Sequence, residues 1–377
     1  MNYNKTLIAI AVATLAAASA QPALAQSATP AVEEKSLRDQ IVTANRIGQD
    51  LADAPAAVTV VTAKDIEQKN VSRISDALLA VPSLHLESSG NGQSFAGAGA
   101  GGFTLRGMDR NRTLVLLDGI PVQNSSNNNV EWKSLFVDDV DRVEVVSGAF
   151  SSLYGSSAMG GVINMISKDP NKREFTVRLK KGFGDAAGND TSVYFRDKLA
   201  NGLGITVGLS QANRDGYASD MVLRPVVTTL TAAQKKAAKV VTGATAMTNS
   251  TGVPSYLVGD KGDSPWKQTN ASLKLVYDLN AQSKIYGGLS YSHIFTDYGP
   301  FNTYLRDATG APVFSGNVNV GGQYLTVAQS NFVTSSPLSG TDKRIFAGYE
   351  GVLAKDYKLK LDVSRVDRSD YFTTIGT

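Results

Sequence analysis

The chain carries few side chains of the types that perform catalysis or bind metals. It has no cysteine, and its two histidines, His85 and His293, stand far apart in the sequence. The lack of cysteine excludes thiolate metal sites, cysteine nucleophiles and disulfides, and neither histidine belongs to a histidine–carboxylate metal spacing. The serines around Gly155 have no histidine nearby in the sequence to act as a base. The sequence therefore predicts no catalytic site, no metal site and no cofactor.

A glycine-rich stretch at residues 97–102 (GAGAGG) contains the G-x-G-x-x-G pattern of dinucleotide-binding sites. Such a site needs a strand before the glycines and a helix after them, because the helix amides bind the pyrophosphate. Here a polar stretch of serine, asparagine and glycine precedes the pattern, and Phe103-Thr104-Leu105 has extended character. The pattern does not indicate a nucleotide site, and a flexible loop is the simpler interpretation.

Residues 39–46 (DQIVTANR) form a short β-prone segment between polar flanks. The segment before it is polar and should be disordered. Two interpretations stay open on the pattern alone. The segment is either an ordinary first strand or a peptide kept exposed so that a partner protein can pair with its backbone.

Residues 1–25 have the three parts of a secretory signal peptide. Lys5 supplies the positive charge, residues 7–18 are apolar or small apart from Thr14, and Ala23-Leu24-Ala25 fits the cleavage pattern. The apolar stretch has about 12 residues, whereas a membrane-spanning helix needs roughly 20. We therefore expect a cleaved signal and an exported protein rather than a helical membrane anchor.

The overall charge and hydropathy narrow the class of protein further. The chain has 37 basic and 34 acidic residues and a formal net charge of +3, so a nucleic-acid partner is not expected. Its mean hydropathy of −0.12 is far below that of a helical membrane protein. This value is compatible with a membrane β-barrel, in which only alternate residues face lipid.

The region up to residue 168 mixes helical and strand patterns. Four strands and two short helices are predicted, at residues 57–62, 113–117, 140–146 and 162–167 and at residues 65–69 and 74–80. The second helix places Ile74, Ala77 and Leu78 on one face. Asp118-Gly119 is a strong signal for a hairpin turn. Together the patterns predict a small α+β domain.

After Asp169 the helical patterns largely give way to alternation with a period of two. Apolar residues alternate with polar ones in four clear segments, at residues 205–209, 273–279, 285–291 and 357–363. The strands that contain these segments would run to roughly 10 residues, the length of a tilted spanning strand. Short connections, and two long ones at residues 213–266 and 297–341, fit an outer-membrane barrel with short turns on one side and long loops on the other. A soluble sandwich rarely tolerates such long loops.

Four ordered segments resemble the TonB-dependent outer-membrane receptors. They are residues 39–46 (DQIVTANR), Leu105-Arg106-Gly107 with residues 113–121 (TLVLLDGIP), residues 141–148 (DRVEVVSG) and residues 153–166 (LYGSSAMGGVINMI). One departure is that Ala149 follows Gly148, where the family usually has proline. The resemblance covers residues 39 to 377, although its barrel part depends on pattern rather than motif.

The resemblance implies a domain organisation and two partners. It divides the chain into a signal peptide (1–25), a flexible arm (26–48), a plug domain (49–168) and antiparallel barrel strands (169–377). The arm would contain a TonB box that pairs with the energy-coupling protein TonB, formed by Asp39, Gln40, Ile41, Val42 and Thr43. A monomer in the outer membrane of a Gram-negative bacterium is expected, with surrounding lipid and an extracellular ligand as the other partners.

The resemblance also assigns roles to residues of the plug. Arg106, Arg142 and Glu144 would contact the barrel wall, since a buried arginine needs a carboxylate partner; the alternative is local salt bridges such as Arg142 with Glu144. Turn residues of the plug would be Gly107, Asp118, Gly119, Gly155, Gly160 and Gly161. Ligand-facing loops would contain Ser94, Phe95, Asn127, Asn128 and Trp132.

The implied function is TonB-dependent uptake of a scarce nutrient complex, with a ferric siderophore as the first expectation. Vitamin B12, haem or carbohydrate uptake are alternatives within the class, and a passive porin-like barrel is the alternative outside it. Family barrels have about 22 strands, which at ~10 residues each need more residues than follow position 168. We therefore expect that this sequence contains only about seven strands of such a barrel.

Overall fold

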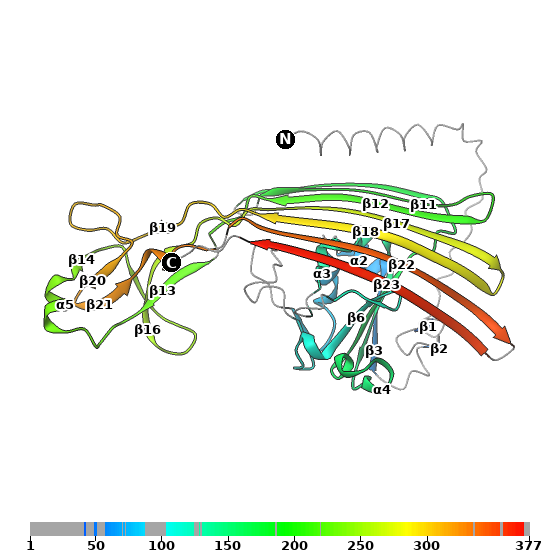
Figure 1. The fold of residues 1–377 in the computed structure, drawn as a ribbon, viewed down its shortest axis with the longest axis horizontal. Helices are drawn as coiled ribbons and strands as arrows, with labels where there is room; N and C mark the ends of the chain where they lie inside the picture. Colours follow the sequence, from blue (N-terminus) through cyan, green and yellow to red (C-terminus); the bar gives the residue numbers. More distant parts are fainter. Residues whose placement is uncertain are drawn as a thin grey trace.

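The computed structural model describes three bodies: a small α+β domain, a long antiparallel sheet, and a β-rich module beyond one end of the sheet (Figure 1). The described residues are 41–42, 49–50, 57–69, 71, 73–86, 103–123, 128, 130–184, 187–218, 220–334, 336–354 and 357–372. The expected signal peptide, the glycine pattern at 97–102, and Asp39, Gln40, Thr43, Ser94, Phe95 and Asn127 lie outside these residues. Among the described helices, none is long and apolar enough to cross a membrane.

The α+β domain is built on a five-stranded mixed sheet in the order β3-β8-β9-β6-β7. Its strands are β3 (Ala57–Thr62), β6 (Thr113–Leu117), β7 (Ile120–Pro121), β8 (Val140–Ser147) and β9 (Gly161–Ser167). Only β6 and β9 run parallel. The other elements are the helices α2 (Ala63–Gln68), α3 (Ile74–Leu78) and α4 (Ser151–Tyr154) and the strand pair β4 (Leu84–Leu86) and β5 (Phe103–Leu105).

Local signals explain why the short helices form. At the start of α2, the Thr62 side chain accepts from the Asp65 amide while the Asp65 carboxylate accepts from the Thr62 amide, a reciprocal capping box. The hydrogen bonds from Thr62 lower the pKa of Asp65. Helix α3 buries Ile74, Ala77 and Leu78 completely, as the helical spacing predicted. These side chains join one apolar core with the inner faces of β6, β8 and β9.

One turn and the start of one strand in this domain show why glycine is required there. Asp118 and Gly119 both have positive φ (53° and 86°), which the tight hairpin between β6 and β7 demands. At Gly161 a Cβ atom would lie 2.3 Å from the Val146 carbonyl oxygen, so β8 and β9 could not pair there with a larger residue. Gly107 and Gly155 also have positive φ, whereas Gly160 is limited by space, since a Cβ would lie 2.7 Å from that of Met108.

The long sheet has seven antiparallel strands in chain order. They are β10 (Glu174–Gly182), β11 (Gly188–Lys198), β12 (Leu203–Arg214), β17 (Trp266–Asn280), β18 (Ser283–Thr296), β22 (Leu338–Ala354) and β23 (Tyr357–Phe372). The predicted α+β domain followed by antiparallel strands is thus confirmed. Because side chains alternate between faces, the sheet has an apolar outer face, with exposed Leu179, Leu289 and Val363, and a polar inner face turned towards the α+β domain.

The two long connections of the sheet fold together instead of forming separate loops. Residues 215–265 and 297–337 contribute to two small sheets, β13-β16-β15 with β19, and β14-β20-β21. The elements are β13 (Met221–Pro225), α5 (Ala232–Ala237), β14 (Lys239–Val240), β15 (Thr245–Thr248), β16 (Pro254–Asp260), β19 (Asn302–Thr303), β20 (Gly316–Val320) and β21 (Gln323–Val327). Val258 from the first connection and Leu305 and Phe332 from the second share one fully buried core. We call this unit the distal module (Figure 1, left).

Candidate functional site

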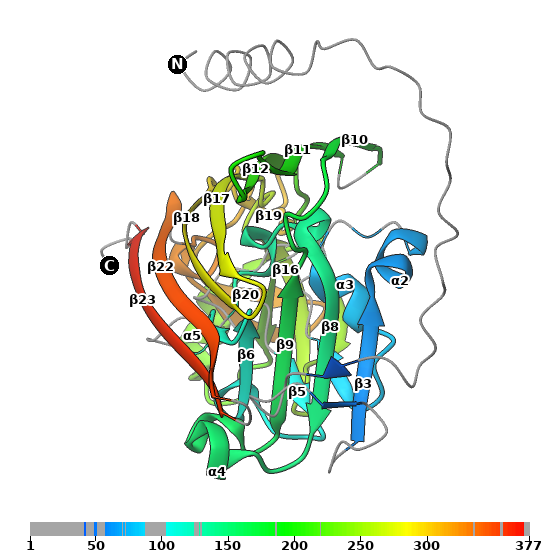
Figure 2. The same ribbon diagram turned by 90° about the vertical axis from the view of Figure 1, so that its right-hand side faces the viewer.

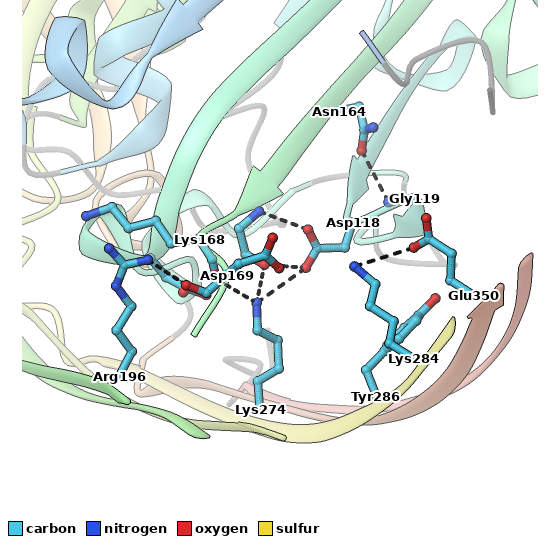
Figure 3. Close-up of polar contacts among 12 residues, drawn as sticks. Asp118, Gly119, Asn164, Lys168, Asp169, Arg196, Lys274, Lys284, Tyr286 and Glu350 are labelled. Atoms are coloured by element: carbon cyan, nitrogen blue, oxygen red, sulfur yellow. Dashed lines mark hydrogen bonds and ion pairs between the residues drawn. The ribbon is translucent and has the colours of Figure 1, made fainter. Parts of the chain in front are cut away.

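The inner face of the sheet meets the α+β domain through polar contacts, and one cluster of them is centred on Asp118 (Figure 3). The Lys274 ammonium on β17 donates to the Lys168 carbonyl (3.2 Å) and to the Ser167 hydroxyl, and lies 4.0 Å from the Asp118 carboxylate. That carboxylate accepts from the amide and the hydroxyl of Ser167 (2.8 and 2.6 Å). One lysine of the sheet thus contacts the ends of two neighbouring strands of the domain.

The hairpin turn at Asp118 makes a second contact with the sheet. Its backbone carbonyl accepts a hydrogen bond from the Lys360 ammonium on β23 (2.8 Å), and the Gly119 amide donates to the Asn164 side chain (3.2 Å). The positive φ of Asp118 belongs to the tight turn that carries this carbonyl. The turn predicted from the sequence therefore also forms part of the interface.

A second cluster contacts the first two strands of the sheet. Arg178 on β10 pairs with Asp138, and the Lys180 ammonium donates to the Val71 carbonyl (2.9 Å). On β11 the Tyr194 hydroxyl donates to the Asp139 carboxylate (2.9 Å). Burial raises the pKa of Asp139 to about 6, although Lys274 acts against the shift. The charged donors lie on the sheet, and the acceptors lie on the domain.

The segment that leads from the domain into the sheet is also anchored. The Arg196 guanidinium on β11 donates to the Asp169 carbonyl (2.7 Å; Figure 3). It also donates to the Glu174 carboxylate. Lys168 pairs with the same carboxylate (3.2 Å). Residues 168 and 169, which connect the α+β domain to β10, are therefore held by these contacts against the first two strands of the sheet.

A cavity of about 330 Å³ separates the domain from the sheet beside the second cluster. Its walls include Asp76 and Phe136 of the domain and Ser192, Arg214 and Gln268 of β11, β12 and β17. It lies towards the end of the sheet that carries the distal module, since Arg214 ends β12 and Gln268 stands near the start of β17. Gln268 is buried, and its carbonyl oxygen has no hydrogen-bond partner among the described residues. The lining of the cavity thus mixes apolar side chains with charged and polar ones, and Gln268 offers an unpaired acceptor.

The three residues expected to contact the barrel wall have local surroundings in the α+β domain. Arg142 donates to Glu144 (2.9 Å) and pairs with Asp141 (3.0 Å), both on the same domain. Arg106 is exposed in a tight turn with φ 55°. The ion pairs of Arg142 are of the local kind that the alternative interpretation describes, and a contact of these residues with the barrel wall stays a prediction. The contacts described above come instead from Lys274, Lys360 and Arg178 of the sheet, whose signal in the sequence was their position out of phase with the apolar residues.

The structure corrects the ligand-facing assignment of Trp132. Its ring is buried in the domain core and packs edge-on against Phe103 at 5.9 Å, because the apolar ring lowers the free energy more in the core than on the surface. Asn128 is partly exposed, with φ 53°, and donates to Asn111. His85 lies on β4 and His293 on β18, and within the described ranges no group of side chains could hold a metal ion.

Two residues of the expected TonB box are described. Ile41 and Val42 form β1, which pairs antiparallel with β2 (Gln49–Asp50). Figure 1 places this pair on the same side of the sheet as the α+β domain, away from the distal module. The backbone of this segment is therefore extended and engaged in strand pairing.

Comparison with known proteins identifies the family to which the α+β domain is similar. The model of the TonB-dependent receptor plug domain matches residues 50–162. The chain is 33% identical over 199 residues to a vitamin B12 transporter of Vibrio vulnificus, covering 53% of this chain and 30% of that protein. It is 30% identical over 225 residues to an iron-regulated outer membrane virulence protein of Vibrio cholerae, covering 56% and 32%. The chain therefore spans about a third of the length of the curated relatives that it matches.

Solved structures show the same fold. The ferripyoverdine receptor of Pseudomonas aeruginosa superposes with a TM-score of 0.55 at 16% identity, over 90% of this chain and 38% of that one. The ferric enterobactin receptor of the same species gives 0.54 at 17% identity, over 84% and 42%. The α+β domain seated against an antiparallel sheet is the arrangement of plug and barrel strands in these receptors. The α+β domain of this chain is therefore a TonB-dependent receptor plug domain, and the chain as a whole is similar to part of the outer-membrane receptors of Gram-negative bacteria that carry such a plug.

Proposed function

We propose that the chain takes part in TonB-dependent uptake of a chelated metal complex across the outer membrane, with a ferric siderophore as the first candidate. The observation that carries the proposal is the seating of the plug on the inner face of the sheet through hydrogen bonds and ion pairs rather than through a shared apolar core. Such contacts can be exchanged for water at low cost. A plug that must move to let a ligand pass needs an attachment of this kind.

The proposed mechanism begins with the ligand on the distal-module side, next to the cavity between plug and sheet. TonB would then pair with the backbone of Ile41 and Val42 on the opposite side, by β-augmentation. These residues already pair with Asp50 and Gln49, so TonB would replace that partner or add a further strand. A pull on this segment would be transmitted through β3 to the plug sheet and would break the contacts with Lys274 and Lys360.

Substitution of Val42 by proline tests the coupling step. Proline lacks the amide hydrogen and cannot complete a strand pair. In the receptor expressed in its own host, Val42→Pro should abolish energised uptake while binding of the ligand at the cell surface persists. Val42→Ala, which keeps the amide, is the matched control and should take up ligand normally. Undiminished uptake by Val42→Pro would refute the assignment of this peptide.

Cobalamin is the second candidate ligand, because a relative at 33% identity is a vitamin B12 transporter. Both candidate ligands are large metal complexes, and a measurement of uptake distinguishes them. Cells that depend on this receptor should accumulate radioactive iron from ferric enterobactin or ferripyoverdine under the first proposal, and radioactive cobalt from cyanocobalamin under the second. Uptake of neither complex would leave both proposals wrong.

A further inference from the structure

The outer face of the sheet has a sharp border between aliphatic and polar residues on the side of the distal module. On each strand the run of large aliphatic side chains on the outer face ends at one residue, beyond which the same face is polar or aromatic, apart from Ala271 on β17. These last aliphatic residues are Leu179, Val193, Leu209, Leu273, Leu289, Ile345 and Val363.

The register of the sheet shows that this border runs obliquely. Leu179 on β10 lies in the row of Thr269 on β17, whereas Val363 on β23 lies in the row of Leu275. The border thus moves six residues along β17 while it crosses the seven strands. With a rise of ~3.4 Å per residue and ~4.8 Å between strands, the slope is about 35°. Strands of outer-membrane barrels tilt by roughly 35–45°, so the oblique border is the level at which the hydrocarbon core of the membrane ends.

Cationic side chains follow this border on its polar side. Lys181, Lys343 and Arg365 each stand two positions beyond the last aliphatic residue of their strand, and Lys267 stands six positions beyond Leu273. All four side chains are exposed. Lys181, Lys267 and Lys343 form no ion pair with another described residue, and Arg365 pairs with Asp367, the one acid among the outward residues beyond the border in the described strands. We call Lys181, Lys267, Lys343 and Arg365 the cationic belt.

The opposite border of the aliphatic band differs. There the outward side chains include Leu279 and Tyr357, which are themselves exposed and apolar or aromatic. The exposed Arg173 at that end is neutralised by Asp197 at 2.7 Å. The surplus of positive charge is therefore confined to the border on the side of the distal module.

We propose that the cationic belt binds the phosphate groups of anionic lipids in the outer leaflet. Each lysine stem can lie along the aliphatic band while its ammonium reaches the headgroup level. Charge complementarity identifies the partner, since on β10, β22 and β23 an acyl chain can cover the last aliphatic residue while its phosphate meets the cation two positions further. Three strand spacings separate Lys181 from Lys267, about 14 Å, so the cations bind separate headgroups rather than chelate one ion.

The test compares two lipids with identical acyl chains. The purified chain in neutral detergent is titrated with phosphatidic acid or with phosphatidylcholine, and bound lipid is counted by native mass spectrometry. Phosphatidic acid should be preferred, and the triple variant Lys181→Gln/Lys267→Gln/Lys343→Gln should lose about tenfold of that preference. The control Lys235→Gln/Lys236→Gln/Lys239→Gln removes the same charge from exposed lysines of the distal module and should keep it.

Three results would overturn the proposal. The triple variant could retain the full preference, or both triple variants could lose it equally, which would mean attraction to net charge alone. A third arm adds inorganic phosphate, which should not compete at millimolar concentration if the aliphatic band contributes to binding. Complete displacement of phosphatidic acid by inorganic phosphate would show a simple anion site instead of a lipid surface.

Discussion

The plug and the distal module are both carried by the same sheet, but they are attached to it in different ways. The module grows out of the strands themselves, and its two connections share a buried core around Leu305 and Phe332. The apolar core of the plug is formed by plug residues alone. The plug contacts the sheet through Lys274, Lys360 and Arg178. A body that stays in place can share an apolar core, whereas a body that has to move needs contacts that water can replace.

Removal of a core side chain from the distal module should have the largest effect. Phe332 is fully buried and packs edge-on against Phe314, so Phe332→Ala should destabilise the module by about 3–5 kcal/mol. Hydrogen exchange of β16, β20 and β21 should accelerate, while β8 and β9 of the plug stay protected. Val240→Ala, at an exposed position of the module, is the control. Loss of protection in the plug as well would mean that the two bodies are not separate.

Loss of one lysine from the interface should weaken docking without unfolding the plug. Lys274→Met should cost about 1–3 kcal/mol of docking, because the ammonium donates to two plug residues. The chain has no cysteine, so Ser272→Cys on the inner face of β17 gives a unique label that undocking exposes. Maleimide should react faster in urea when Lys274→Met is present. Lys267→Met, on the outer face of the same strand, should react at the original rate; equal acceleration by both would argue against the docking role.

Protonation of the Asp139 carboxylate should make the docking of the plug depend on pH. Its pKa is about 6 in the docked plug and returns towards 3.8 once solvated, so the docked state holds the proton more tightly. Docking should therefore weaken by roughly 1–3 kcal/mol in total as the pH rises from about 4 to about 6. Above that pH the docking free energy should stay constant. Asp139→Asn should flatten this slope and slow the labelling of Cys at position 272 at pH 7. A slope that survives the substitution would assign the effect to another group.

The smallest expected effect concerns the internal stability of the plug. Thr62→Ala removes both hydrogen bonds of the capping box that involve the hydroxyl and should destabilise the plug by about 1 kcal/mol. Thr62→Ser keeps the hydroxyl and should have almost no effect. Thermal unfolding of the plug measures the loss, and labelling at position 272 should not change, because Thr62 makes no contact with the sheet in the described structure.

Much of this architecture could be predicted because it depends on local patterns. Alternation of Leu273, Leu275 and Tyr277 identified a strand with one apolar face, and Asp118-Gly119 identified the turn between β6 and β7. The side on which plug and sheet meet could not be predicted from Arg106 and Arg142, because their partners depend on which plug surface faces the sheet. The joint folding of the two long connections was also missed, since β14 pairs with β20 across almost 80 intervening residues and no local pattern encodes such a pair.

The contacts of the plug reach both outer strands of the described sheet, β10 through Arg178 and β23 through Lys360. Figure 2 shows the sheet curving around the plug between these two points. Because the folded plug contacts both outer strands, it fixes the distance between them. That distance in turn fixes how strongly the sheet curves. A folded plug would select one curvature from the many that a twisted seven-stranded sheet can adopt. The plug can thus serve as a template during assembly, before any ligand or energy source is involved.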